Sequence, residues 1–183
     1  MLRPPHALLL ALLPLPGLMA AGVHQHGVAQ LDLVIEPPLI AVAFSSPLAN
    51  LTGFEHAPST ADEQQIWDRA LAQLRRSEEL IRLPAAADCS LSRADLHLPF
   101  IPETGQQTST QAHAHDHAHE GSDTGHHADL MAEYQYLCAN SAALEALEFP
   151  LMQVFPAIER LDIQSITPTG QHRHTLTHGQ TRL

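Results

Sequence analysis

The chain has 183 residues, 44% of them hydrophobic, which is enough to bury the core of one domain of ordinary size. Its nine basic residues are all arginines and face twenty acidic residues, giving a formal net charge of −11 at pH 7. This charge argues against nucleic acid as a partner and favours cations. Without lysine, the chain cannot use phosphate-loop or Schiff-base lysine chemistry.

The N-terminal segment has the pattern of an export signal. Arg3 precedes an apolar run that is interrupted by Pro14 and Pro16 and ends in Ala-Ala-Gly. The run is too short and too often broken by proline for a membrane span, so we expect a signal peptide over residues 1–22. No later stretch of sequence is apolar over the thickness of a bilayer, so the mature protein is expected to be soluble and outside the cytoplasm.

Two stretches near the start of the mature chain alternate between apolar and polar residues, which predicts strands at 28–36 and 39–47. Pro37 and Pro38 separate the two stretches, so we expect a β-hairpin.

The longest predicted helix begins after Thr60. Thr60 followed by Glu63 is the pattern of a capping box, and the helix is expected to run to about Ser77, with a short strand after it at 79–83. One face of this helix is apolar and is expected to pack on the core: Ile66, Trp67, Ala70, Leu71 and Leu74.

Four further stretches alternate in the manner of strands: 89–100, 131–139, 159–167 and 171–177. A short helix is expected at 141–147. Because strands outnumber helices and helices interrupt them irregularly, we predict an α+β fold. It would be a single domain, residues 23–183, with one antiparallel sheet, one long helix and one or two short ones.

The chain has two cysteines, Cys89 and Cys138. An even count in an exported chain favours a disulfide. If the strands at 89–100 and 131–139 form a hairpin, one register sets the two cysteines directly opposite each other. A Cys/His metal site is the alternative, although CxxC spacing is absent.

The segment at 102–130 separates these two strands and contains almost no aliphatic side chain before Leu130. Burial cannot offset the entropy of ordering such a segment, so we expect a disordered loop that is mobile until something binds. Six histidines lie in it: His113, His115, His117, His119, His126 and His127.

Neutral imidazole is a common ligand for zinc and also suits copper and nickel. Any His-x-His pair on a flexible chain supplies two ligands, and nearby carboxylates such as Asp116 and Glu120 complete a shell. Many interchangeable ligand sets favour metal capture over catalysis, and no HExxH motif is present. A solvated linker with incidental histidines is the alternative.

A second candidate set lies in the predicted folded part. His24 and His26 precede the first strand, and Glu55 and His56 lie in the loop before the long helix. These four side chains form an acceptable zinc ligand set if the fold brings them together. Alternatively, the N-terminal histidines belong to a frayed terminus, and Glu55 or His56 caps the helix.

Several short strings resemble those of the ZrgA-type zinc uptake proteins: "HQHGVAQLDLVIE", "SSPLANLTGFEHAPST", "ADCSL", "AEYQYLCA" and "VFPAIERLDIQSITPTGQ". The resemblance covers nearly the whole mature chain, in order. It implies a periplasmic zinc-binding protein, not an enzyme, that works with an ABC-type zinc import system. His24 and His26 match the family's HxHG, residues 53–56 its GFEH, and Cys89 and Cys138 its two cysteines.

Three other interpretations remain open. It could be a passive nickel, copper or zinc buffer or metallochaperone without a transporter. It could also be a zinc-dependent hydrolase with Glu55 as base, or an interaction module that binds another exported protein. In each metal-binding case, binding should weaken below about pH 6.5, because imidazole must be neutral to act as a ligand.

Four more histidines lie in predicted strands or just after them. His97 shares a strand face with Asp95, and His172 shares one with His174, so either pair has ligand geometry. Ordinary exposed strand histidines are the alternative for both pairs and for His178.

Overall fold

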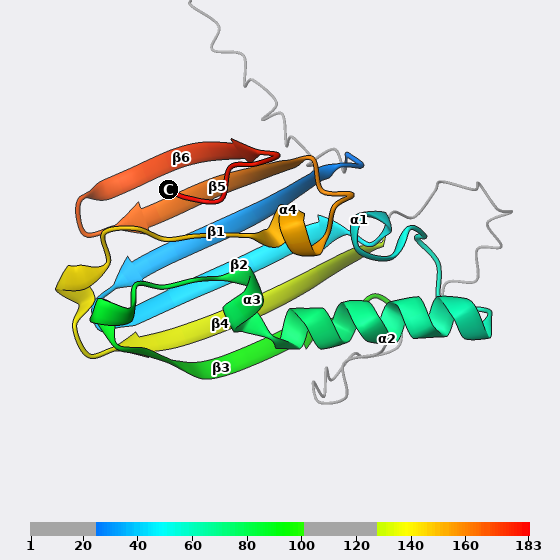
Figure 1. Cartoon of the computed structure of the whole chain (residues 1–183), viewed down its shortest axis with the longest axis horizontal. Coiled ribbons are helices and arrows are strands. Elements are labelled where there is room, and N and C mark those ends of the chain that lie inside the picture. The colour runs from blue at the N-terminus through cyan, green and yellow to red at the C-terminus, as the bar shows by residue number, and fades with distance from the viewer. Residues whose placement is uncertain (1–24, 101–127) are drawn as a thin grey trace, which may run out of the picture.

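The computed structural model of the chain describes residues 25–100 and 128–183 (Figure 1). Six strands form one sheet in the order β3-β4-β2-β1-β5-β6, and the helices of the described segments lie on one face of it (Figure 1). The predicted α+β class and single sheet are therefore confirmed. The strands are β1 Val28–Glu36, β2 Leu39–Pro47, β3 Cys89–His97, β4 Asp129–Cys138, β5 Arg160–Thr167 and β6 Gly170–Thr177.

Four of the five strand pairings are antiparallel, and β1 with β5 is parallel. The expectation of an antiparallel sheet is correct except for this pair. After β4 the chain returns across the helix-covered face and enters β5 beside β1 in the same direction (Figure 1). Such a crossover is what a parallel neighbour requires.

The predicted hairpin of β1 and β2 is present, with Glu36 opposite Leu39 across the turn at Pro37–Pro38. In both strands alternate residues are buried, as in Leu31 and Val42, because one sheet face meets the helices.

The long helix, α2, spans Ala61–Arg75 and begins with the predicted capping box between Thr60 and Glu63. Trp67, Ala70, Leu71 and Leu74 are buried, whereas Ile66 is 37% exposed at the edge of the apolar face.

The end of α2 and the segment after it differ from the prediction. The helix stops before Ser77, and residues 79–83 do not form a strand. A short helix, α3 (Ser77–Leu80), comes first, and only Arg82 makes an isolated bridge, with Glu148. Leu80 and Ile81 are buried in the core at the end of this short helix. They are hydrophobic because they pack there, and not because they belong to a strand.

The remaining helices are single turns. The helix predicted at 141–147 is reduced to one 3₁₀ turn, η2 (Ser141–Ala143), because the chain then extends to bury Leu147 and Phe149. The other short turns are α1 (Ala49–Thr52), η1 (Ala85–Ala87) and α4 (Leu151–Val154).

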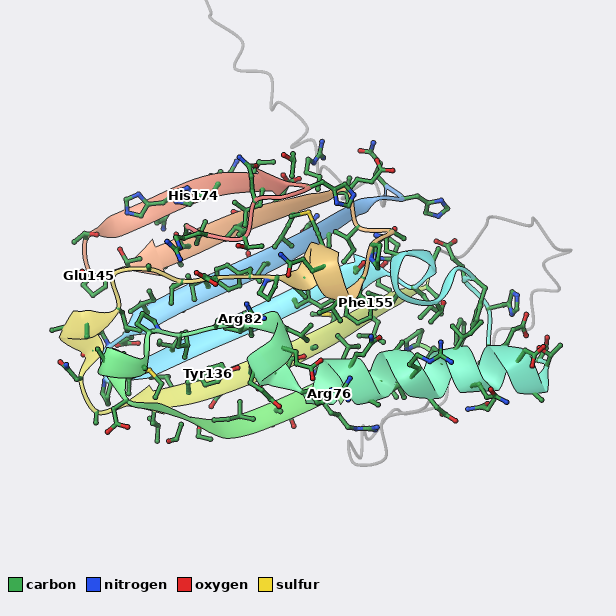
Figure 2. The ribbon with its side chains drawn as sticks, viewed as in Figure 1. Arg76, Arg82, Tyr136, Glu145, Phe155 and His174 are labelled. Atoms are coloured by element: carbon green, nitrogen blue, oxygen red, sulfur yellow. A yellow bond between two sulfur atoms is a disulfide. The ribbon has the colours of Figure 1, made fainter. Side chains whose placement is uncertain are left out.

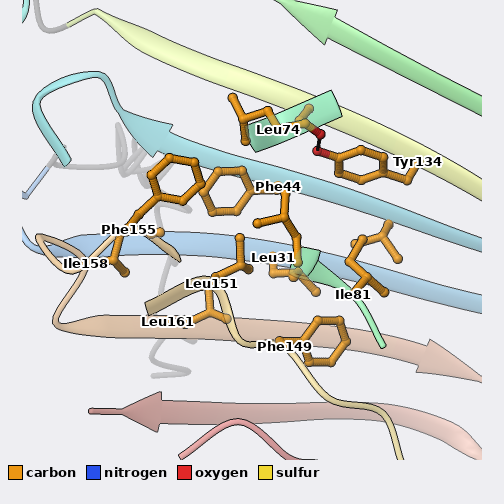
Figure 3. Packing of buried hydrophobic residues seen from close by; sticks show 14 of the residues in the cluster. Leu31, Phe44, Leu74, Ile81, Tyr134, Phe149, Leu151, Phe155, Ile158 and Leu161 are labelled. Atoms are coloured by element: carbon orange, nitrogen blue, oxygen red, sulfur yellow. Dashed lines mark hydrogen bonds between the residues drawn. The ribbon is translucent and has the colours of Figure 1, made fainter. Parts of the chain in front are cut away.

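The core lies between the sheet and this layer of helices and connecting segments (Figure 3). Phe44 and Leu31 from the sheet meet Leu151 and Phe155 from the layer above. The hydroxyl of Tyr134 donates to the Leu74 carbonyl at 2.6 Å, which links β4 to α2. Burial raises the pKa of Tyr134, consistent with a hydroxyl that acts as a donor in the core.

β3 and β4 pair with Cys89 directly opposite Cys138, and the two cysteines form the expected disulfide.

The loop predicted at 102–130 ends too late in the sequence, because β4 begins at Asp129 and Leu130 is fully buried. The rest of that segment, with its six histidines, lies outside the described residues, as do the predicted signal peptide and His24. Within the described ranges, no helix is long and apolar enough to cross a membrane.

The disulfide joins residues 49 apart in sequence. Because such a link removes loop entropy from the unfolded chain, replacing both cysteines by serine should lower the free energy of unfolding by about 2–4 kcal/mol. Urea denaturation of the oxidised protein and of the double variant measures this difference. Equal stabilities would contradict a structural role for the bridge.

Candidate metal site

His26 and Glu55 come from segments far apart in sequence and meet at the start of β1. The His26 Nε2–H donates to Glu55 Oε1 at 2.7 Å. The His26 side chain is 62% exposed and that of Glu55 is 23% exposed, so the pair lies at the surface with the imidazole open to solvent. An ion can therefore reach the ring without any opening of the fold.

Asn50, in α1, holds both segments in place. Its Oδ1 accepts the Gly27 N–H at 2.8 Å, and its Nδ2 donates to the Val28 carbonyl at 3.0 Å and to Ser46 Oγ at 3.1 Å. The side chain is thereby tied to the residues that follow His26 and to the end of β2. Asn50 is only 4% exposed, and its bonds to Gly27 and Val28 are partly buried, so water compensates poorly for loss of the amide.

Two glycines shape the chain beside these ligands. Gly53 ends α1 in the left-handed conformation, with φ of 87°, and its N–H donates to the Ala49 carbonyl, which turns the chain toward Glu55. Gly27 has φ of 79°, and a Cβ on it would lie 3.3 Å from the Glu159 side chain. Both positions therefore require glycine for conformational reasons.

His56 has different partners from His26. Its ring stacks on Phe54, with centroids 5.2 Å apart, and its Nδ1–H donates to the Ala57 carbonyl at 3.0 Å. Its Nε2 lies 3.8 Å from Glu63 Oε1, which is an ion-pair distance and not a hydrogen bond.

Glu63 stays ionised next to His56. The Ser59 backbone N–H donates to its Oε2, and this bond, followed by that of the Ser59 hydroxyl, holds the pKa of Glu63 below its usual range. The same oxygen accepts the Thr60 N–H in the capping box. Neither Glu55 nor His56 caps α2; Thr60 does.

His26 and Glu55 can supply two of the four ligands of a zinc site. The two atoms share a proton at 2.7 Å. Zinc–ligand distances of about 2.0–2.2 Å would place the same nitrogen and oxygen about 3.4 Å apart in a tetrahedral site. A zinc ion can take the place of this proton if the imidazole carries its proton on Nδ1 instead and the two side chains separate by about 0.7 Å.

The four-ligand set predicted from the sequence is only partly assembled among the described residues. His26 and Glu55 are together, His56 turns to Glu63, and His24 lies outside the described residues. In residues 25–100 and 128–183, no group of three or more His, Cys, Asp and Glu side chains is arranged to hold a metal ion.

Both attachment points of the histidine-rich segment lie at the same end of the sheet as this pair. β3 ends at His97 and β4 begins at Asp129, which pairs with Pro47 at the end of β2. The Leu48 N–H, just before α1, donates to the Ala128 carbonyl at 2.7 Å. Ala128 is also buried, so it belongs to the folded domain.

The other strand histidines lie apart from the pair. His97 Nε2 is 3.9 Å from Glu133 Oε2, while Asp95, on the same face, pairs with Arg93. His172 and His174 are exposed on β6, and His178 is exposed just after that strand.

Sequence reasoning overlooked Asn50 and the contact of Glu63 with His56. The sequence signal for Asn50 was an amide between Ala49 and Leu51 in the turn after β2. The sequence predicted only the capping role of Glu63. A capping box involves one carboxylate oxygen and does not show that the other oxygen faces His56.

A family model described as "ZrgA family zinc uptake protein" matches residues 23–183 of the chain. No protein in the curated set matches it.

Asn50→Ala should lower the free energy of unfolding by about 2–4 kcal/mol, because it leaves the Gly27 N–H and the Val28 carbonyl without their partner. Asn140→Ala is the matched control. Asn140 is exposed and makes one side-chain bond, to the Ala86 carbonyl, so its loss should cost below about 1 kcal/mol. Urea denaturation compares the two, and equal effects would contradict the special role of Asn50.

Proposed function

Because the chain belongs to the ZrgA family of zinc uptake proteins, we propose that it is a periplasmic protein that captures zinc for import. The predicted signal peptide, residues 1–22, supports export. Zinc uptake requires a carrier across a membrane, and we assign that step to an ABC-type importer, as the sequence resemblance implies.

The pairing of His26 with Glu55 carries the proposal for a fixed zinc site. An imidazole from the turn before β1 and a carboxylate from the loop before α2, 29 residues apart, meet at 2.7 Å. The His26 side chain is 62% exposed, and the carboxylate supplies one of the charges that a divalent ion needs. His24, two residues from His26, is the proposed third ligand, and His56 the fourth after rotation away from Glu63.

The histidine-rich segment is proposed to collect zinc and pass it to this pair. Support comes from its ligand content and from its attachment at the same end of the sheet as His26. A high local concentration of exchangeable imidazoles beside an incompletely coordinated pair favours transfer over permanent retention.

We propose binding and release of zinc, not catalysis. Catalytic zinc is usually held by three protein ligands with one position open to water. The four ligands proposed above leave no such position open, which favours a carried ion over a catalytic one.

Glu55→Gln should lower the zinc affinity of the tight site at least about tenfold, because the neutral amide is a poor zinc ligand and leaves the ion's charge uncompensated. Calorimetry of the mature protein, residues 23–183, with a competing chelator measures the affinity.

Glu36→Gln is the matched control for this experiment. Glu36 is exposed at the other end of β1 from His26, so the fold and the tight zinc affinity should both be kept. An unchanged affinity in Glu55→Gln would refute the proposed site, as would an equal loss in both variants.

A further inference from the structure

Two histidines of β6 lie outside the site described above and share a face of the sheet. His172 and His174 are two residues apart in the strand, so their side chains project to the same side, and Arg173 projects to the other. In the register with β5, His172 is opposite Ser165 and His174 is opposite Ile163. The backbone that carries both rings is therefore fixed by strand pairing.

The rings are open to solvent because the covering layer ends before it reaches them. Ile163 and Leu176, on the same face, are buried, whereas His172 and His174 are exposed. β6 is also the last strand of the described sheet, and Figure 2 shows His174 at this outer edge, away from the helices. A cation and its waters can thus approach from the face and from the edge.

The two rings are almost close enough to share one ion. Their centroids are 6.3 Å apart and their planes are tilted by 32°. Metal–nitrogen distances of about 2.0 Å place the centroids of two neighbouring rings about 4.5 Å apart in the tetragonal site that Cu(II) prefers. Rotation of exposed side chains covers this difference. Among the described residues, neither ring is engaged in a hydrogen bond or ion pair that would oppose the rotation.

We propose that His172 and His174 form a separate site for a late first-row divalent cation, completed by water. Two imidazole nitrogens bind Cu(II) more tightly than Zn(II) or Ni(II), so Cu(II) is the preferred occupant. The net charge of −11 favours the approach of cations. The proposal goes beyond the zinc site at His26 and Glu55 and does not depend on it.

This site can be tested by nuclear magnetic resonance of the mature protein, which follows the amide signal of each residue separately. Cu(II) is added stepwise until the spectra stop changing. Bound Cu(II) broadens nearby signals because it is paramagnetic. The amide signals of residues 172–174 should broaden in the unaltered protein, and this broadening should be lost in the double variant His172→Gln, His174→Gln. The control His178→Gln, which removes a neighbouring imidazole and leaves the pair, should keep it.

The proposal is wrong if the β6 signals retain their intensity at saturation or if their broadening persists in the double variant. Both replaced side chains are exposed, so the double variant should keep the fold, and the same spectra report whether it does. Signals of residues 26–28 and 53–57 report the His26–Glu55 pair independently. Failure at either site is therefore distinguishable from failure at the other.

Discussion

A buried asparagine connects the two segments that carry the candidate zinc ligands. The Asn50 amide accepts from Gly27 and donates to Val28 and Ser46, so both of its polar ends are satisfied inside the fold. One end of this network lies next to His26, and α1, which contains Asn50, leads through Gly53 to Glu55. The 2.7 Å contact between two exposed side chains thus depends on bonds made by a side chain that is buried.

The disulfide and the candidate zinc ligands lie at opposite ends of the sheet. The Cys89–Cys138 bridge closes β3 and β4 at one end, where Leu39 begins β2. The His26–Glu55 pair and the attachment points of the histidine-rich segment lie at the opposite end. Covalent and packing constraints therefore hold the strands while the proposed binding end stays accessible, as an ion that is captured and released requires.

Much of the fold was predictable because local patterns determine it. Alternation in the strands, the capping box at Thr60 and the position of the two cysteines each follow from short-range sequence. The parallel pairing of β1 with β5 was missed, since it depends on where a long crossover returns. For the candidate site, the sequence identified His26 and Glu55, but the turn of His56 toward Glu63 depends on ring stacking and helix capping that spacing does not encode.

We infer that the folded domain holds zinc at His26 and Glu55 without help from the histidine-rich segment. Calorimetry with a competing chelator tests it most directly, on a mature protein whose six segment histidines are replaced by asparagine. This change keeps the chain length and leaves Ala128, which bonds to Leu48, in place. One tight zinc site should remain while weaker sites disappear. Loss of all tight binding would contradict it and assign zinc capture to the segment alone.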